Sequence, residues 1–155
     1  MENTKYKKNN IHVLIVSPTR ELAIQTHDTL MEAGAPIGIH SICLYGGVPK
    51  DEQKKALKGD KKLRIIVGTP GRLIDLVNDE AVDFSKFVNF ALAQYRLLTV
   101  SDHPSVSYMV LDEADRMLEK GFANDIQKLI GMTRPGENRQ TLMCRWHIFN
   151  LGGSH

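Results

Sequence analysis

Features that would place this chain in a membrane, a secreted scaffold or a metal site are missing from its sequence. There is no run of about 18 apolar residues and no signal-like apolar core at the N-terminus, so we expect a soluble intracellular protein without membrane contact. Cys43 and Cys144 lie far apart without a CxxC, which indicates a reducing compartment. The six histidines are scattered singly, without metal-ligand spacing. The formal net charge of +2 gives no overall basic field, so any contact with nucleic acid must be local.

The composition is that of one globular domain. The chain has 155 residues, of which 42% are hydrophobic and 25% are charged. Residues 1–10 are polar and basic, and they predict a disordered lead-in. After them strands and helices alternate, which predicts a parallel α/β sheet. The predicted strands cover 11–16, 39–44, 64–67, 108–111 and the start of a strand at 139–143.

Two further stretches predict helices. Residues 50–62 mix both signs of charge, which favours a short helix with a solvated face and an exit loop. Residues 118–133 have the pattern of one amphipathic helical stretch.

An acidic turn follows the strand predicted at 108–111. A buried parallel strand delivers such acids to its carboxyl end, which is the ligand-binding end of open α/β sheets. There Asp112 would offer an anionic oxygen to hydrated Mg²⁺. Glu113 could orient or deprotonate a water molecule for attack on a γ-phosphate. The alternative for an apolar run followed by Asp-Glu is a solvated acidic turn.

Three other predicted strands also run into short polar segments. Residues 17–20 (SPTR) can cap a helix, and a capped helix start is an anion site. Residues 45–47 (YGG) allow a sharp turn or a close backbone approach to a ligand. Residues 68–72 (GTPGR) again combine a threonine that can cap a helix, a proline suited to the first helical turn and a glycine that leaves room for a phosphate. Taken alone, each segment would usually be only a structural turn or helix cap.

Taken in order, the strings PTRELAIQ, GG, GTPGR and DEAD resemble motifs Ia, GG, Ib and II of the DEAD-box ATP-dependent RNA helicases. The resemblance covers about residues 11–86 and 106–143. It implies that the domain is the first of two RecA-like domains, a parallel sheet flanked by helices. It also implies an enzyme that hydrolyses ATP with Mg²⁺ and unwinds or remodels RNA.

The same resemblance gives roles to individual residues. Catalysis would fall to Asp112 and Glu113, and Asp112 would hold Mg²⁺ through water. Nucleotide binding is implied for Asp112, Glu113, Ala114 and Asp115. Backbone contacts to RNA, with little sequence specificity, are implied for Pro18, Thr19, Arg20, Gly46, Gly47, Thr69, Pro70, Gly71 and Arg72.

The residues after DEAD look most like family members that work in ribosome biogenesis. The string that carries this likeness is EKGF, followed by a later isoleucine. It implies proteins of pre-ribosomal particles as partners and a location in the nucleus or nucleolus. A cytoplasmic location is the alternative.

The sequence departs from the family before motif Ia. It contains no GxxxxGK[ST], because it begins too late to include motif I or the adenine-reading Q motif. The second RecA-like domain is absent as well. We therefore expect an incomplete RecA-like sheet without its P-loop strand, and no ATP hydrolysis by these residues alone. The alternative function is that of a non-catalytic truncated fragment with weak binding to the RNA backbone or to a partner.

Two segments within and after the predicted domain, 11–143, also depart from the family. Residues 87–105 interrupt the approach to DEAD, either as an extra helix or as translated non-coding sequence. We hypothesise a retained intron: a transcript without those codons would support this, and detection of the segment in the mature protein would contradict it. Residues 144–155 form a divergent tail, because RQTLM leads into CRWH where the family has a Ser-Ala-Thr motif.

Overall fold

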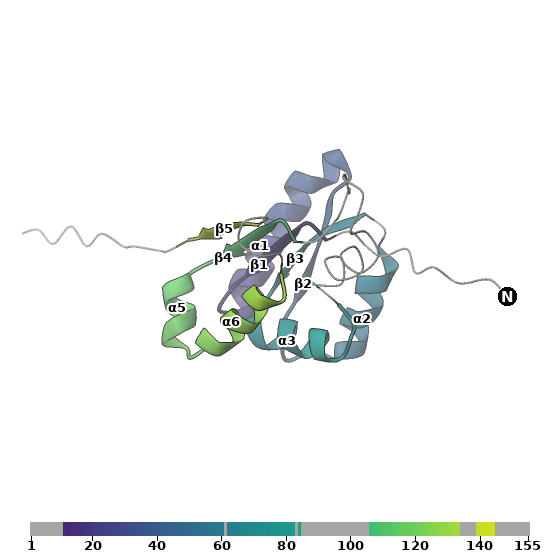
Figure 1. Cartoon of the computed structure of the whole chain (residues 1–155). Helices are drawn as coiled ribbons and strands as arrows, with labels where there is room; N and C mark the ends of the chain where they lie inside the picture. The colour runs from purple at the N-terminus through teal and green to yellow at the C-terminus, as the bar shows by residue number, and fades with distance from the viewer. Residues whose placement is uncertain (1–10, 61, 83, 85–105, 134–138, 145–155) are drawn as a thin grey trace, which may run out of the picture.

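A five-stranded parallel sheet forms the centre of the protein, as predicted (Figure 1). The computed structural model describes residues 11–60, 62–82, 84, 106–133 and 139–144. Along the chain the strands are β1 (Val13–Val16), β2 (His40–Leu44), β3 (Leu63–Gly68), β4 (Tyr108–Leu111) and β5 (Gln140–Met143). In the sheet their order is β2-β3-β1-β4-β5. Each strand falls within a residue or two of its predicted position, because runs of apolar residues between turn signals mark strands buried on both faces.

Helices cover both faces of this sheet. They are α1 (Arg20–Gly34), which runs into the 3₁₀ turn η1 (Ala35–Ile37), then α2 (Lys50–Gly59), α3 (Pro70–Asn78), α5 (Ala114–Glu119) and α6 (Ala123–Gly131). None of the helices in the described ranges is both long and apolar enough to cross a membrane.

Alternating side chains along the strands create two hydrophobic layers. Leu14 and Val16 of β1 pack in the larger core, beneath α2, α3, α5 and α6. Ile15 points to the opposite face, where it packs with Ala23 of α1. The layer under α1 is thinner, and its Cys43 thiol has a pKa raised to about 11, mainly by burial.

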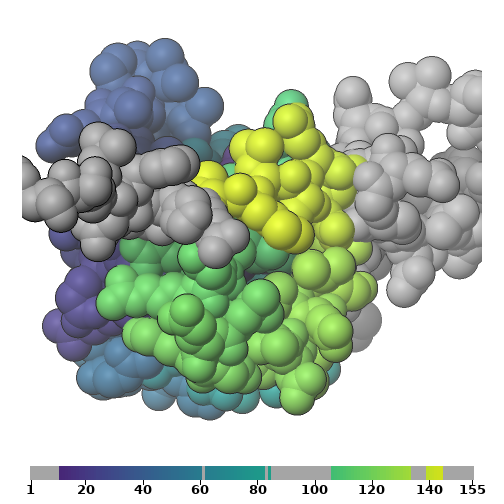
Figure 2. Space-filling view, turned by 90° about the vertical axis from the view of Figure 1, so that its left-hand side faces the viewer, coloured from purple at the N-terminus to yellow at the C-terminus, as the bar shows by residue number. Residues whose placement is uncertain are grey.

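The outer strand β5 leaves apolar side chains on the surface. Figure 2 shows it in yellow above α5 and α6, and Leu142 and Met143 are both exposed.

The helical stretch predicted over residues 118–133 is in fact divided. Helix α5 ends at Glu119 and α6 begins at Ala123, because Gly121 between them adopts a left-handed conformation with φ +82°. The Gly121 amide donates to the Leu118 carbonyl oxygen at 3.0 Å, which closes a turn. Periodicity alone could not detect this break, since the apolar pattern continues across it.

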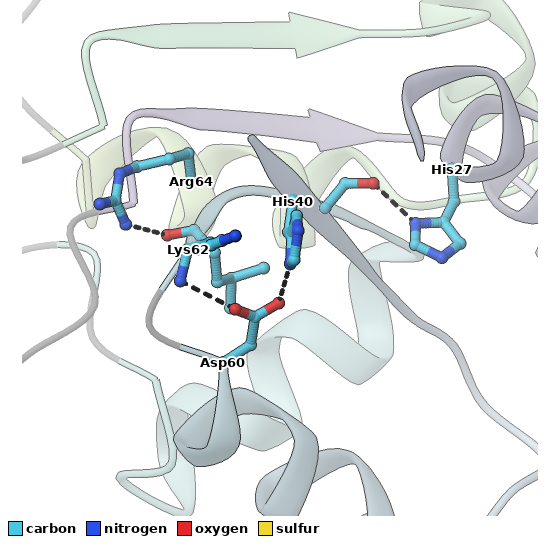
Figure 3. A network of polar contacts seen from close by, with 7 residues as sticks. His27, His40, Asp60, Lys62 and Arg64 are labelled. Atoms are coloured by element: carbon cyan, nitrogen blue, oxygen red, sulfur yellow. Dashed lines mark hydrogen bonds and ion pairs between the residues drawn. The ribbon is translucent and has the colours of Figure 1, made fainter. Parts of the chain in front are cut away.

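A compact polar network lies at the amino-terminal edge of β2 and β3 (Figure 3). His40 Nδ1 lies 2.6 Å from an Asp60 carboxylate oxygen, whose other oxygen accepts from the Lys62 amide at 2.8 Å. Burial would raise the pKa of Asp60, but the hydrogen bonds from His40 and Lys62 outweigh this and lower it. On α1, the helix before β2, His27 lies 2.8 Å from the Ser41 hydroxyl, and burial lowers its pKa. These contacts anchor the amino-terminal end of β2, away from the carboxyl edge of the sheet.

Gly34, at the end of α1, packs closely against the backbone that leads into β2. A Cβ atom at this position would lie 2.3 Å from the Ile39 carbonyl oxygen, so the backbone itself must move. We expect Gly34→Ala to lower the free energy of unfolding by about 1–3 kcal/mol, measured by urea denaturation. Gly131→Ala is the matched control, since among the described residues nothing lies within 4 Å of its Cβ position. Equal stability of the two variants would contradict the prediction.

Three of the predicted segments are not part of the described structure. The lead-in 1–10, the insertion 87–105 and the tail beyond Cys144 all lie outside the described residues. Phe84 and Val106, which stand on either side of the insertion, are both buried in the larger core.

Candidate functional site

The carboxyl ends of all five strands lie at one edge of the sheet and in register. Val16 pairs with both Gly68 and Leu111, Leu44 pairs with Gly68, and Leu111 pairs with Met143. The polar segments singled out in the sequence begin at or directly after these residues. The parallel topology therefore brings together residues that are up to about a hundred positions apart in the sequence.

Backbone hydrogen bonds extend the sheet one residue beyond β1, β3, β4 and β5. The Ser17 amide donates to Gly68 at 3.0 Å and the Thr69 amide to Leu44 at 3.0 Å. On the other side the Asp112 amide donates to Val16 at 2.9 Å and the Cys144 amide to Leu111 at 2.9 Å. The residue that follows each of these four strands is thus held by the same hydrogen-bond ladder as the strand.

The acidic turn after β4 carries its two carboxylates in different settings. Asp112 is half-buried, and its pKa is raised by burial and by the charge of Glu113. Glu113 has φ +49° and ψ +51°, a left-handed conformation that costs a non-glycine residue about 1–2 kcal/mol. The Ala114 amide donates to Cys144 at 3.1 Å, which ties the turn to the end of β5.

Arg116 holds the Glu113 side chain in place. Its guanidinium lies 3.0 Å from Glu113 Oε2, one turn along α5. The Glu113 side chain is 16% exposed, whereas that of Arg116 is 53% exposed. Asp115 is half-buried, and its Oδ1 accepts from the Arg116 amide at 3.0 Å.

The acidic turn is chemically suited to a hydrated Mg²⁺ that also binds phosphate. Asp112 is a carboxylate whose ionised form is disfavoured by its surroundings, so a nearby cation would relieve that cost. No group of three or more His, Cys, Asp or Glu side chains able to hold a metal occurs in the described part of the chain. Mg²⁺ in phosphate sites uses one or two carboxylates and completes its shell with water and phosphate, so a single carboxylate such as Asp112 fits this role.

Asp112 should make the stability of the ligand-free protein depend on pH. Its pKa is raised above the ordinary 3.8, so the folded state binds the proton more tightly than the unfolded chain. The free energy of unfolding should fall as pH rises from about 4 through the raised pKa. Asp112→Asn removes this fall, so we expect its Tm to exceed that of the unmodified protein near neutral pH more than at about pH 4. A variant that melts lower at neutral pH would contradict the prediction.

The segment after β1 presents a charged side chain at the start of a capped helix. Thr19 caps α1, as predicted, and its Oγ1 accepts from the Leu22 amide at 3.3 Å. Arg20 is exposed, so its side chain can reach a ligand. Pro18 is buried, so its ring packs inside the protein. Ser17 is fully buried, and its hydroxyl has no hydrogen-bond partner among the residues described.

The segment after β2 exposes bare backbone. Gly46 and Gly47 are both exposed, and Gly47 has φ +85°, which only glycine adopts without strain. Within the described ranges, nothing lies inside 4 Å of a Cβ placed on either glycine. A ligand can therefore approach the main chain there.

The segment after β3 divides into outward and inward residues. Thr69 is half-buried and Gly71 is exposed, while Pro70 is buried in the first turn of α3. In the described part of the chain, the Thr69 hydroxyl makes no capping hydrogen bond, so it remains available to a ligand.

Arg72, for which the resemblance implies RNA contact, is turned inward in this structure. Resemblance placed it on RNA, but it is only 9% exposed. Its Nη1 donates to Gln53 Oε1 at 2.9 Å and its Nη2 to the Val48 carbonyl at 3.0 Å. In this structure the guanidinium braces the backbone beside Gly47 and does not face outward.

Sequence reasoning missed two residues of this site. Gln53 is buried, although the charged stretch 50–62 predicted a solvated face, and its Nε2 donates to the Tyr45 carbonyl at 3.1 Å. Tyr45 lies against Arg20. The signal for Gln53 was its position four residues, about one helical turn, before Leu57, which is also buried.

Comparison with known proteins gives consistent matches. A sequence model of the DEAD/DEAH box helicase family matches residues 1–144. The chain is 47% identical over 133 residues to ATP-dependent RNA helicase DBP3 of Yarrowia lipolytica, covering 86% of this chain and 21% of that protein. It is 47% identical over 137 residues to the protein of the same name from Saccharomyces cerevisiae, covering 88% and 22%. The chain thus spans about a fifth of the length of these curated relatives.

A solved structure matches over a similar share of the chain. It is a DEAD box protein from the hyperthermophile Methanococcus jannaschii, with a TM-score of 0.69 and 31% sequence identity, covering 90% of this chain and 32% of that one. Because the family model and the relatives span most of the chain, this protein belongs to the DEAD/DEAH box helicase family.

Proposed function

We propose that the protein is an ATP-dependent RNA helicase, in which hydrolysis of ATP is coupled to the remodelling of bound RNA. The observation that carries this proposal is the single sheet edge that joins the acidic turn to three segments suited to phosphate contact. Those segments are residues 17–20, 45–47 and 68–72, and the acidic turn is Asp112-Glu113.

The nucleotide half of the site rests on the acidic turn. Glu113 orients the attacking water and accepts its proton, and the ion pair with Arg116 sets where its carboxylate points. Asp112 would hold the hydrated cation, and Ala114 and Asp115 would contribute to binding the nucleotide. Mg²⁺ bound with ATP would neutralise the charge that develops on the phosphates.

The RNA half contacts the sugar-phosphate backbone. Arg20 supplies a positive charge, the amide groups of Gly46 and Gly47 supply donors, and Thr69 supplies a hydroxyl. Such contacts carry little sequence information, so binding should be salt-sensitive and largely independent of sequence.

Strand β1 connects the two halves. Its last residue, Val16, accepts from the Asp112 amide, while the next residue, Ser17, donates to Gly68 of β3. A movement of the acidic turn would therefore be transmitted to the segments after β1 and β3 through two backbone hydrogen bonds. We propose this path as the link between the nucleotide and RNA halves.

The direct test is release of phosphate from MgATP by the full-length protein, with and without single-stranded RNA. We expect hydrolysis that RNA stimulates, together with RNA binding that weakens steeply as salt is raised. RNA binding without any ATP hydrolysis would overturn the enzymatic proposal in favour of a non-catalytic RNA-binding protein. Absence of both activities would overturn the RNA proposal too.

We further propose that the protein acts in ribosome assembly, in the nucleus or nucleolus. The likeness of the residues after DEAD to ribosome-biogenesis members supports this proposal. Sedimentation of the protein with pre-ribosomal particles on a sucrose gradient is the expected result. Sedimentation only with free soluble proteins would contradict it.

A further inference from the structure

Arg20 stacks on the ring of Tyr45 across two segments of the RNA half. The guanidinium carbon lies 5.2 Å from the ring centroid, within the range of a cation–π contact. Arg20 is the first residue of α1, and Tyr45, 25 positions later, follows β2. Strand β3 separates β1 from β2 in the sheet, so this contact spans the width of three strands.

Arg20 has few other interactions that hold it. Its side chain is exposed, and among the described residues it forms no ion pair. An exposed arginine without partners samples many rotamers and loses that freedom when it binds a phosphate. A ring that already restricts the guanidinium reduces this loss.

Tyr45, by contrast, is firmly placed. It is half-buried, and its carbonyl oxygen accepts from Gln53 Nε2 at 3.1 Å. The residue before it, Leu44, is fully buried in the larger core and its carbonyl accepts from the Thr69 amide. These contacts fix the backbone that carries the half-buried Tyr45 ring, next to the exposed backbone of Gly46 and Gly47.

We propose that Tyr45 is a positioning residue for RNA binding: its ring holds the Arg20 guanidinium at the sheet edge, ready for an RNA phosphate. The inference rests on the proposed RNA binding and adds a residue to it. Tyr45 acts through Arg20 and does not itself stack on a base.

The experiment is a double-mutant cycle in the full-length protein. Affinity for a short single-stranded oligouridine RNA is measured by fluorescence anisotropy over a series of salt concentrations for Tyr45→Leu, Arg20→Met and the double variant. We expect Tyr45→Leu to weaken binding about 2- to 5-fold, the range set by an exposed cation–π contact. Arg20→Met should also lower the slope of log K against log salt by about 0.7, one phosphate contact on a single strand. In the Arg20→Met background, Tyr45→Leu should have no further effect.

Matched variants separate this role from a loss of structure. Tyr45→Phe keeps the ring and should bind RNA as the unmodified protein does. Tyr108→Leu removes a tyrosine at the amino-terminal end of β4, away from the site, and should leave affinity unchanged. In the free protein, the ring current of Tyr45 should shift the resonances of the Arg20 side chain, and Tyr45→Leu should abolish that shift.

Two different outcomes would overturn the inference, and only the second would also overturn the proposed function. Additive effects of Tyr45→Leu and Arg20→Met, with RNA binding intact, would mean that Tyr45 contacts RNA by itself. Absence of RNA binding by the unmodified protein would overturn the proposed function, and this inference with it.

Discussion

Glu113→Gln is expected to lower RNA-stimulated ATP hydrolysis by about 10²- to 10⁴-fold, the usual contribution of a general base. Glutamine keeps the shape of the side chain and can still orient water, but it cannot accept a proton. The backbone should tolerate the change, since glutamine enters the left-handed conformation at this position with a strain similar to that of glutamate. Phosphate release at saturating RNA and ATP measures the effect.

The control is a glutamate on the same short helix. Glu119 is exposed at the end of α5, so Glu119→Gln makes the same chemical change outside the acidic turn. Its hydrolysis rate should match that of the unmodified protein. RNA affinity without nucleotide should be unchanged in both variants, because neither residue lies in the RNA half. A Glu113→Gln variant that keeps a tenth or more of the activity would exclude Glu113 as the base.

The strand pattern shows what a sequence can disclose about this fold. Runs such as IHVLIV and RIIV are apolar over their whole length, and each ends in a turn or cap signal. Burial on both faces follows from such runs, and parallel pairing follows from the helices between them. The common edge for Asp112 and residues 17–20, 45–47 and 68–72 was thus deducible before any coordinates, since parallel strands share their carboxyl end.

The direction of individual side chains was not deducible in the same way. Gly71 and Arg72 are neighbours in one string, yet the first is exposed and the second is buried. The difference arises because α3 turns Arg72 toward Gln53 of α2, a residue nineteen positions earlier. A resemblance assigns the role of a family motif to all of its residues together. Tertiary packing decides which of those residues face a ligand. The contact between Arg20 and Tyr45 depends likewise on a strand order that no local pattern encodes.

Arg72→Met should have the second large effect, on stability. Methionine can fill much of the space, but it cannot donate hydrogen bonds to Gln53 Oε1 and the Val48 carbonyl. Hydrogen bonds from a charged donor contribute about 1.5–3 kcal/mol, and buried acceptors left without a donor are costly. We therefore expect the free energy of unfolding to fall by about 2–4 kcal/mol, measured by urea denaturation. In a Gln53→Leu background the same change should cost less, because one of the two acceptors is already gone.

The same variant decides whether Arg72 contacts RNA directly. As a brace, it keeps Tyr45 through Val48 in place without touching phosphate, so its loss should weaken RNA binding and leave the salt dependence as it was. As a direct contact, its loss would lower the slope of log K against log salt by about 0.7 on single-stranded RNA. Affinities are compared per folded molecule, at a temperature where Arg72→Met remains folded. An unchanged slope together with weaker binding supports the brace, because a side chain that never meets phosphate releases no counterions from it.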